Sequence, residues 1–244
     1  MKYAIRLLTI LLFLAGCISL VYQSAENNRL AAEVLRLEAE LGKMSIKDAS
    51  QVHIVEIEVP DVPPEVALHV ERVWQFRCYL PPGCDFKKVC GSGRITEEGL
   101  YQGGEFDTSW GTPKSTADHN LLTVSLRKEG RRLQTFYGFG GLSRTTWWSP
   151  FNPDHLGTIV VQKLVSSNRG ARSFDQNTIL QLLKIYDPST AEEKEVAGRS
   201  FTTYQGGQFI LCPRSREMYL NQLRNGETPR DFDAGWLATA VADE

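Results

Sequence analysis

The side chains best suited to acid–base chemistry in this chain are its four histidines: His53, His69, His119 and His155. Two of them follow an aspartate, in Asp118-His119 and Asp154-His155, and a neighbouring carboxylate can orient an imidazole for proton transfer. Adjacent residues of an extended chain face opposite ways, however, so neither pair is expected to form one catalytic site. The sequence also lacks the motifs of zinc proteases, serine hydrolases, phosphate-binding loops and dinucleotide-binding folds. The sequence therefore leaves the catalytic residues, if there are any, unknown. We predict no cofactor, and an enzyme is the less favoured interpretation.

Four cysteines beyond the N-terminal segment offer a second kind of chemistry: Cys78, Cys84, Cys90 and Cys212. In an oxidising compartment this even number allows two disulfides, so all four residues are disulfide candidates with their pairing left open. A reactive thiol at Cys84 is the alternative, because the neighbouring Lys87 and Lys88 would lower its pKa. Zinc sites favour closer spacings than the five residues that separate the first three cysteines, so no metal site is predicted.

Aromatic residues gather in residues 137–151, together with several glycines and one arginine. On a loop, Arg144, Trp147 and Trp148 would form a stacking surface for a sugar ring or a partner protein, with Trp110 as a companion. The simpler alternative, which we favour, is that one tryptophan closes the end of a β-sandwich while the other packs on a neighbouring strand. Trp110, Arg144, Trp147 and Trp148 are nevertheless the candidate binding residues.

Charge and composition narrow the classes of partner. The 244 residues include 27 Lys and Arg against 29 Asp and Glu, which gives a net charge of -2 and an isoelectric point near 6.1. Such a chain has no basic field to hold phosphates, so nucleic acid is not an expected partner. With 42% apolar residues, a chain of this length can bury one large or two small cores.

Short apolar stretches separated by Gly, Pro and Ser predict a mainly β domain, either a β-sandwich or a barrel-like fold. Residues 66–80 alternate with period two, which is typical of a long strand with one wet face. Residues 121–139 predict a hairpin around Glu129-Gly130. The other predicted strands cover residues 55–59, 157–166, 199–204 and 208–212.

Two surface helices are predicted within this domain. One covers residues 189–198, where Ser and Glu have the spacing of a capping box, and the other covers residues 215–224. Residues 178–186 fit either a helix or a strand. Residues 229–244 are predicted to form a tail in which three residues are able to dock: Phe232, Trp236 and Leu237.

An apolar segment with a basic start opens the chain. Residues 7–22 contain no charged side chain, and a helix of this length, extended by residues 4–6, comes close to the thickness of the hydrocarbon layer. This predicts a membrane anchor over residues 1–24, with residues 4–22 in contact with the membrane. We expect a single pass, with the C-terminal part extracytoplasmic.

Within this segment, Leu14-Ala15-Gly16-Cys17 resembles the lipobox of bacterial lipoproteins at all four positions. The resemblance covers only the first 17 residues, and it implies cleavage before Cys17 and lipid attachment to its thiol. The apolar run continues from Ile18 to Tyr22, where a lipoprotein usually turns polar. An uncleaved anchor is therefore favoured, and a lipoprotein and an ordinary cleaved signal remain alternatives.

Residues 25–45 predict a short helical, coiled-coil-like stalk. Its seam positions recur at alternating spacings of three and four: Asn27, Leu30, Val34, Leu37, Leu41 and Met44. A homo-oligomer through residues 27–44 is one interpretation, yet Glu33 and Glu38 would face each other in a parallel dimer. A solvated continuation of the anchor helix and a different helical partner are the alternatives.

The sequence therefore predicts five segments: an anchor (1–24), a stalk (25–45), a linker with a first strand (46–64), a mainly β extracytoplasmic domain (65–228) and a tail (229–244). We expect a membrane-anchored module that binds or assembles with an unknown ligand, either an envelope polymer or a protein. One alternative is a hydrolase of envelope polymers whose active site no motif reveals. The other is a structural envelope component that self-associates through the stalk.

Overall fold

Strands dominate the structure, which is a computed structural model. It describes residues 46–57, 70–148, 151–196 and 198–242, together with Met44 and several of residues 16–30. Most of the predicted anchor and most of the predicted stalk lie outside the described residues, and those described within residues 16–30 are helical. Among the described residues, no helix is long and apolar enough to cross a membrane.

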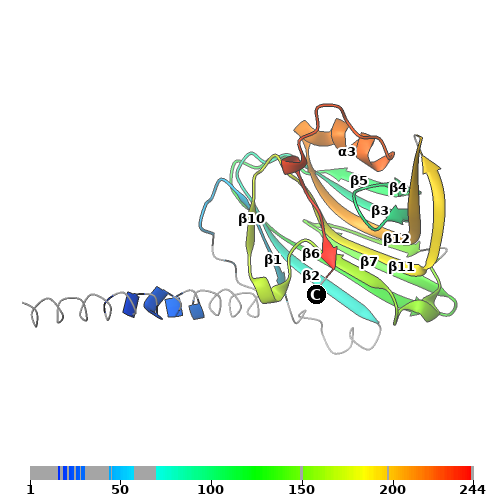
Figure 1. Ribbon diagram of the computed structural model, residues 1–244, viewed down its shortest axis with the longest axis horizontal. Coiled ribbons are helices and arrows are strands. Elements are labelled where there is room, and N and C mark those ends of the chain that lie inside the picture. The colour runs from blue at the N-terminus through cyan, green and yellow to red at the C-terminus, as the bar shows by residue number, and fades with distance from the viewer. Residues whose placement is uncertain are drawn as a thin grey trace, which may run out of the picture.

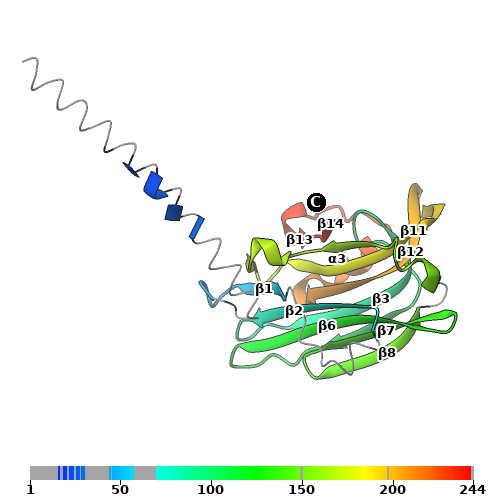
Figure 2. The ribbon, with the colours of Figure 1, turned by 90° about the horizontal axis from the view of Figure 1, so that it is seen from below.

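The strands form two sheets that lie face to face (Figures 1 and 2). Sheet A has the strand order β10 (Arg172–Phe174), β1 (Val52–Ile57), β2 (Arg72–Leu80), β6 (Asp118–Glu129), β7 (Arg132–Phe139) and β8 (Leu142–Trp148). Sheet B has the order β14 (Val241–Ala242), β9 (Val160–Lys163), β11 (Ile179–Val196), β12 (Arg199–Pro213), β3 (Phe86–Thr96) and β4 (Gln102–Gly103). In addition, β13 (Leu237–Ala238) pairs parallel with β11, and β5 (Phe106–Trp110) pairs antiparallel with β3. The predicted mainly β fold is confirmed, with two sheets stacked as in a β-sandwich.

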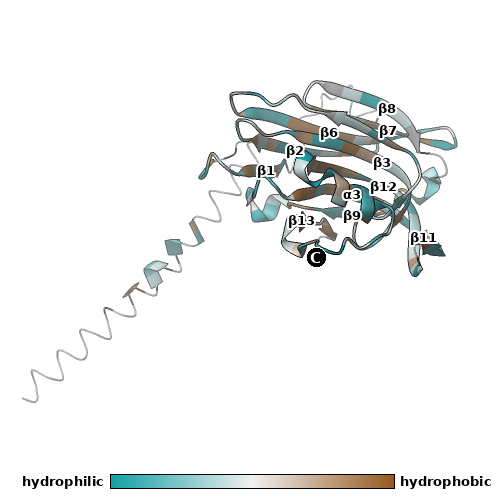
Figure 3. Ribbon diagram, turned by 90° about the horizontal axis from the view of Figure 1, so that it is seen from above, coloured by the Kyte–Doolittle hydropathy of each residue, from teal (hydrophilic) through white to brown (hydrophobic). Residues whose placement is uncertain are grey.

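The main core fills the space between the sheets because side chains alternate along each strand. Phe76 and Val124 point inward from sheet A, and Leu182 and Phe209 from sheet B, each at most 3% exposed. Burying a side chain of this size stabilises the fold by about 1.5–3 kcal/mol. Figure 3 shows the pattern behind this layer, with hydrophobic and hydrophilic residues following one another along β6. The hairpin predicted for residues 121–139 is formed by β6 and β7.

A second, smaller core covers the outer face of sheet B. Helix α3 (Glu217–Arg224) packs Leu220 against Val89 of β3 and Ile210 of β12. This helix confirms the one predicted for residues 215–224. Within the described part of the chain, single turns of 3-10 helix join the elements of the fold: η1 (Pro153–His155), η2 (Ser167–Arg169), η3 (Arg214–Arg216) and η4 (Ala234–Trp236).

The predicted tail packs against α3 and sheet B and is part of the folded domain. The rings of Phe232 and Trp236 contact the ring of Tyr219 on α3, with centroids 5.9 and 5.5 Å apart. Beyond them, β13 and β14 add to sheet B. The docking residues were therefore predictable, whereas the two short strands were not.

The helix predicted for residues 189–198 is absent from the described structure, because β11 continues through this region and pairs with β12. Ser189 uses its backbone N–H and its hydroxyl to bond Asp187 Oδ1, at 3.0 and 2.7 Å, instead of capping a helix. The register between the two strands shifts between Asp187 and Glu192, as in a β-bulge. Residues 178–186, which fitted either element, belong to β11 from Ile179 onward.

Lys184 holds the segment after β3 against the outer face of sheet B. Its side chain is fully buried, and its Nζ donates to the carbonyl oxygens of Thr96, Glu97 and Gly99 at 3.1, 2.8 and 3.0 Å. All three N–H donors of the ammonium group therefore have a backbone acceptor. Burial lowers the pKa of Lys184 to about 8, although nearby Glu97 acts to raise it.

Candidate functional site

A groove runs between the sheets where β5 is an edge of sheet B and β8 is an edge of sheet A. We call it the seam groove and define it by Lys88, Cys90, Asp107, Tyr137 and Arg144. Three adjoining hollows form it. The first hollow, which Arg144 lines, shares Cys90, Asp107 and Tyr137 with the second, middle hollow. The middle hollow shares Lys88 with the third. The three hollows thus adjoin one another along the open side of the sandwich.

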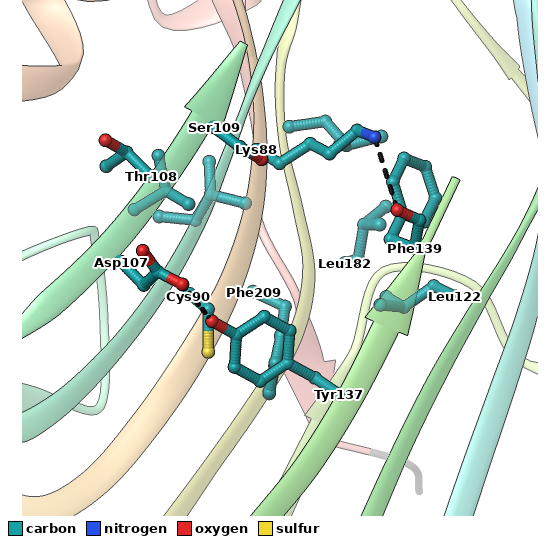
Figure 4. A pocket seen from close by; sticks show the side chains of 13 residues that line it. Lys88, Cys90, Asp107, Thr108, Ser109, Leu122, Tyr137, Phe139, Leu182 and Phe209 are labelled. Carbon is teal, nitrogen blue, oxygen red and sulfur yellow. Dashed lines mark hydrogen bonds between the residues drawn. The ribbon is translucent and has the colours of Figure 1, made fainter. Parts of the chain in front are cut away.

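The middle hollow is an apolar slot. Leu122 and Phe139 line it from sheet A, and Leu182 and Phe209 line it from sheet B (Figure 4). Leu211 of sheet B lines it as well. All five side chains belong to the main core, so the slot continues the core toward the surface. An apolar group that entered the slot would leave water at a gain of about 25 cal/mol per Å².

Lys88 stands between this slot and the third hollow. Strand β3 places it there because Lys88 lies opposite Leu211 of β12, whose side chain is part of the main core. Its Nζ donates one hydrogen bond, to the carbonyl oxygen of Phe139 at 3.3 Å, and lies 4.8 Å from the centre of that ring (Figure 4). No carboxylate oxygen among the described residues lies within 4.0 Å of this ammonium. Burial lowers the pKa of Lys88, and Asp118 opposes this effect only from beyond contact distance.

The β7–β8 turn makes room for the Lys88 ammonium. Gly140 has a φ of +58°, which a residue with a side chain rarely adopts. A Cβ atom at Gly140 would lie 2.7 Å from Lys88 Nζ and 2.6 Å from Asn120 Oδ1. The backbone conformation therefore favours a glycine at this turn, and a side chain there would displace the ends of the Lys88 and Asn120 side chains.

A polar cluster forms the rim on the other side of the slot. Tyr137 Oη donates a hydrogen bond to Asp107 Oδ2, and Arg144 Nη1 lies 3.0 Å from the same oxygen. Strand pairing brings these groups together, because Tyr137 lies directly opposite Arg144. The hydrogen bond from Tyr137 is the main reason why the pKa of Asp107 is lowered. Burial, followed by this bond, raises the pKa of the Tyr137 phenol.

The four cysteines are free thiols in the described structure, so none of the candidate disulfides is formed. Cys78 faces the main core from sheet A and Cys212 belongs to the second core on the outer face of sheet B, so these two lie in different layers. Burial raises the pKa of Cys84, which is the opposite of the lowering expected from its lysine neighbours. Burial also raises the pKa of Cys90 in the seam groove. Neither thiol is set up as a nucleophile at neutral pH.

Neither of the two Asp-His pairs forms one site. In strand β6, Asp118 pairs with Lys114 at 2.6 Å while the ring of His119 contacts that of Tyr79. The second pair lies in the 3-10 turn η1 and not in an extended segment. Asp154 binds Lys128 at 2.6 Å, while His155 turns to the fully buried Asp187 at 2.7 Å. Ser189 Oγ lies 2.9 Å from the same Nδ1 atom of His155. A serine-protease-like relay needs the serine and the aspartate on opposite ring nitrogens, so this cluster does not form one.

The four predicted binding residues lie at or near the seam groove. Arg144 lies on its rim, and Trp110, Trp147 and Trp148 lie on the two edge strands that flank it. The side chains of these tryptophans are outside the described part of the structure, so their role as binding residues stays a prediction. Lys88 was missed because β3 was not predicted, and only its pairing with β12 turns this lysine inward.

Comparison with known proteins identifies no relative, because no protein-family model, no curated protein and no solved structure shows a significant match to the chain.

Proposed function

We propose that this protein is a binding module whose seam groove takes a ligand with an apolar group next to a carboxylate. The observation that carries this proposal is Lys88. Its half-buried ammonium has one hydrogen bond, no carboxylate within 4.0 Å among the described residues, and an apolar slot at its side.

A partly buried charge without a counter-ion is costly, and proteins normally pair it or coordinate it. The other two cations of the groove already have such partners. Arg144 is paired with Asp107, and Lys114, on the wall of the third hollow, is paired with Asp118 at 2.6 Å. A ligand that supplies one negative charge would therefore complete the groove. Its apolar part would fill the slot beside Lys88.

Binding is supported better than catalysis by the chemistry of the groove. The thiol of Cys90 and the phenol of Tyr137 both have raised pKa values, so each keeps its proton at neutral pH. No histidine lines any of the three hollows among the described residues. The groove thus offers no activated nucleophile with a neighbouring base.

The tether of this module is the second part of the proposal. Residues 1–24 supply the anchor and residues 25–45 the stalk, which together would hold the groove outside the cytoplasm near a membrane. This part rests on the apolar N-terminal sequence alone, and the four free thiols give export no support. Protease digestion of intact cells or spheroplasts tests it, because an extracytoplasmic domain is cut without breaking the membrane. Protection of the domain until lysis would contradict this topology.

The ligand class is tested with small matched probes on the full chain in detergent. N-acetyl-L-leucine carries an apolar group and a carboxylate, N-acetyl-L-leucinamide lacks the charge, and acetate lacks the apolar group. We expect only the first to raise the unfolding temperature, and Lys88→Met to abolish that rise. Lys128→Met, which removes an exposed lysine paired with Asp154, is the charge-matched control and should respond like the parent protein. An equal response to the acid and the amide would contradict the proposal.

A further inference from the structure

We propose that the ligand of the seam groove is the C-terminal end of an extended polypeptide, which pairs with β5 as an added strand. The last residue of this polypeptide turns into the apolar slot and sets its terminal carboxylate against Lys88. This inference rests on the proposed function and names the class of its ligand.

The first support is the open edge of β5, whose single partner among the described strands is β3. Backbone hydrogen bonds fix the pattern of this pair at both ends. The N–H of Ser92 donates to the carbonyl oxygen of Glu105 at 2.9 Å, and the N–H of Gly111 donates to that of Phe86 at 3.0 Å. Bonding alternates along an antiparallel pair, so every second residue of β5 turns its backbone groups away from β3.

This alternation decides which backbone groups face the open side. Asp107 and Ser109 bond to β3, while the N–H and C=O groups of Phe106, Thr108 and Trp110 point to the free edge. Phe106 lines the first hollow of the groove, and Thr108 lines the apolar slot. The edge that can accept another strand is therefore a wall of the seam groove itself.

The second support is the position of Lys88 relative to this edge. Lys88 of β3 lies opposite Ser109 of β5, so its side chain enters the groove beside the last residues of β5. In this arrangement a strand laid along β5 would end next to the slot, so that its terminal apolar side chain would enter the slot and its terminal carboxylate would meet Lys88. Free edges repeat their donors and acceptors about every 6.8 Å, a spacing that a polypeptide matches and a sugar chain or fatty acid does not.

The last strand of the described chain is not the expected occupant. Strand β14 pairs with β9 at the opposite edge of sheet B from β5. A separate polypeptide with an apolar last residue fits the slot better.

The test uses three sets of synthetic peptides, measured by calorimetry on the full chain in detergent. Each set contains N-acetylated hexapeptides of alternating threonine and valine that end in alanine, valine, leucine or phenylalanine. The first set has a free carboxylate, the second a C-terminal amide, and the third a free carboxylate with alternate backbone nitrogens methylated. Methylation blocks strand pairing while it keeps the side chains and the charge.

We expect at least one free acid to bind more tightly than N-acetyl-L-leucine, and its amide and methylated forms to bind about tenfold more weakly. Equal binding by the methylated peptides would overturn strand addition and leave the carboxylate-binding proposal intact. If neither the peptides nor N-acetyl-L-leucine binds, both proposals fail. Dimers that form through β5 and exclude the peptides would also overturn the inference, because a second copy would then be the partner.

Two proline variants test the same point from the protein side. Thr108→Pro removes an N–H that β3 does not need, although this N–H also lies against the Asp107 carboxylate. Thr145→Pro makes the matching change on the free edge of β8, the opposite wall. We expect Thr108→Pro to weaken peptide binding about tenfold and Thr145→Pro to leave it unchanged. If Thr108→Pro fails to fold, the methylated peptides still decide the question.

Discussion

The two sides of the sandwich differ in whether a lysine between the sheets has a carboxylate as its counter-ion. On the closed side, Lys163 of β9 lies 3.0 Å from both carboxylate oxygens of Glu56 on β1, and the backbone N–H of Ser167 adds a bond of 2.9 Å. On the open side, Lys88 has one carbonyl oxygen as its hydrogen-bond acceptor. On the closed side, the carboxylate of Glu56 is thus the counter-ion of Lys163, and this ion pair links the two sheets. The open side leaves a cation and an apolar slot for a ligand.

The largest effect is expected from breaking the closed side. Glu56→Gln removes the negative charge that faces Lys163, and the two side chains are only 8% and 14% exposed. Loss of one partner of a buried ion pair should lower the free energy of unfolding by about 3–5 kcal/mol. Urea unfolding followed by tryptophan fluorescence measures this change. Lys88→Met is the matched comparison on the open side and should change stability by less than about 1 kcal/mol. Similar losses in both variants would contradict the contrast.

A third lysine sharpens the comparison, because Lys184 is satisfied by carbonyl oxygens instead of a carboxylate. Lys184→Met leaves the carbonyl oxygens of Thr96 and Glu97 without the ammonium that now binds them. The desolvation cost of the lysine disappears at the same time, so we expect a smaller loss than at Glu56, about 2–3 kcal/mol. Urea unfolding at pH 7 tests this order. A variant as stable as the parent protein would show that the three hydrogen bonds do not stabilise the fold.

The pH dependence of stability gives a second view of Lys184. Its pKa is about 8 in the folded protein, against an ordinary value of 10.5. The unfolded chain therefore holds more protons than the folded chain between these two values, and the free energy of unfolding should rise with pH across that window. Comparison of the parent protein with Lys184→Met isolates this group from the other titrating residues. A steeper rise in the variant would contradict the assigned direction of the pKa shift.

The smallest effect is expected at the rim of the seam groove. Tyr137→Phe removes the hydrogen bond to Asp107 and should cost about 1 kcal/mol. The pKa of Asp107 should rise toward its ordinary value, because this bond is the main cause of its lowering. An NMR titration of the aspartate carboxyl carbons measures the rise. Arg144→Gln removes the ion pair and leaves the phenol in place, and it should also raise the pKa of Asp107, because Arg144 lowers it through a hydrogen bond and through its charge. An unchanged pKa of Asp107 in Tyr137→Phe would contradict the role given to the phenol.

Much of the fold followed from periodicity, and its failures have identifiable causes. Alternation in residues 66–80 and 121–139 predicted strands that face the core. Strand β3 was missed because its middle, Cys90-Gly91-Ser92-Gly93, has the composition of a loop. The structure explains one of these glycines by a long-range contact, since a Cβ on Gly91 would lie 1.9 Å from the side-chain oxygen of Gln102. No local pattern in the sequence predicts that contact.

The candidate site was less predictable than the fold. Arg144 was identified from its aromatic surroundings, but its partners Asp107 and Tyr137 come from two other strands. Lys88 became visible only when β3 was paired with β12, because that register turns the lysine inward. Sites between two sheets depend on pairing over long stretches of chain, which composition and spacing do not encode.

The most direct test of the central claim is the pKa of the Lys88 amino group, measured by NMR with and without N-acetyl-L-leucine. The Lys88→Met variant assigns the signal. We expect a pKa below the ordinary value of 10.5 in the free protein, because the group is partly buried without a counter-ion. Binding of the probe should raise this pKa, since a neighbouring carboxylate favours the charged amine. A pKa of Lys88 that stays unchanged at saturating probe would contradict the claim that this lysine awaits the anion of a ligand.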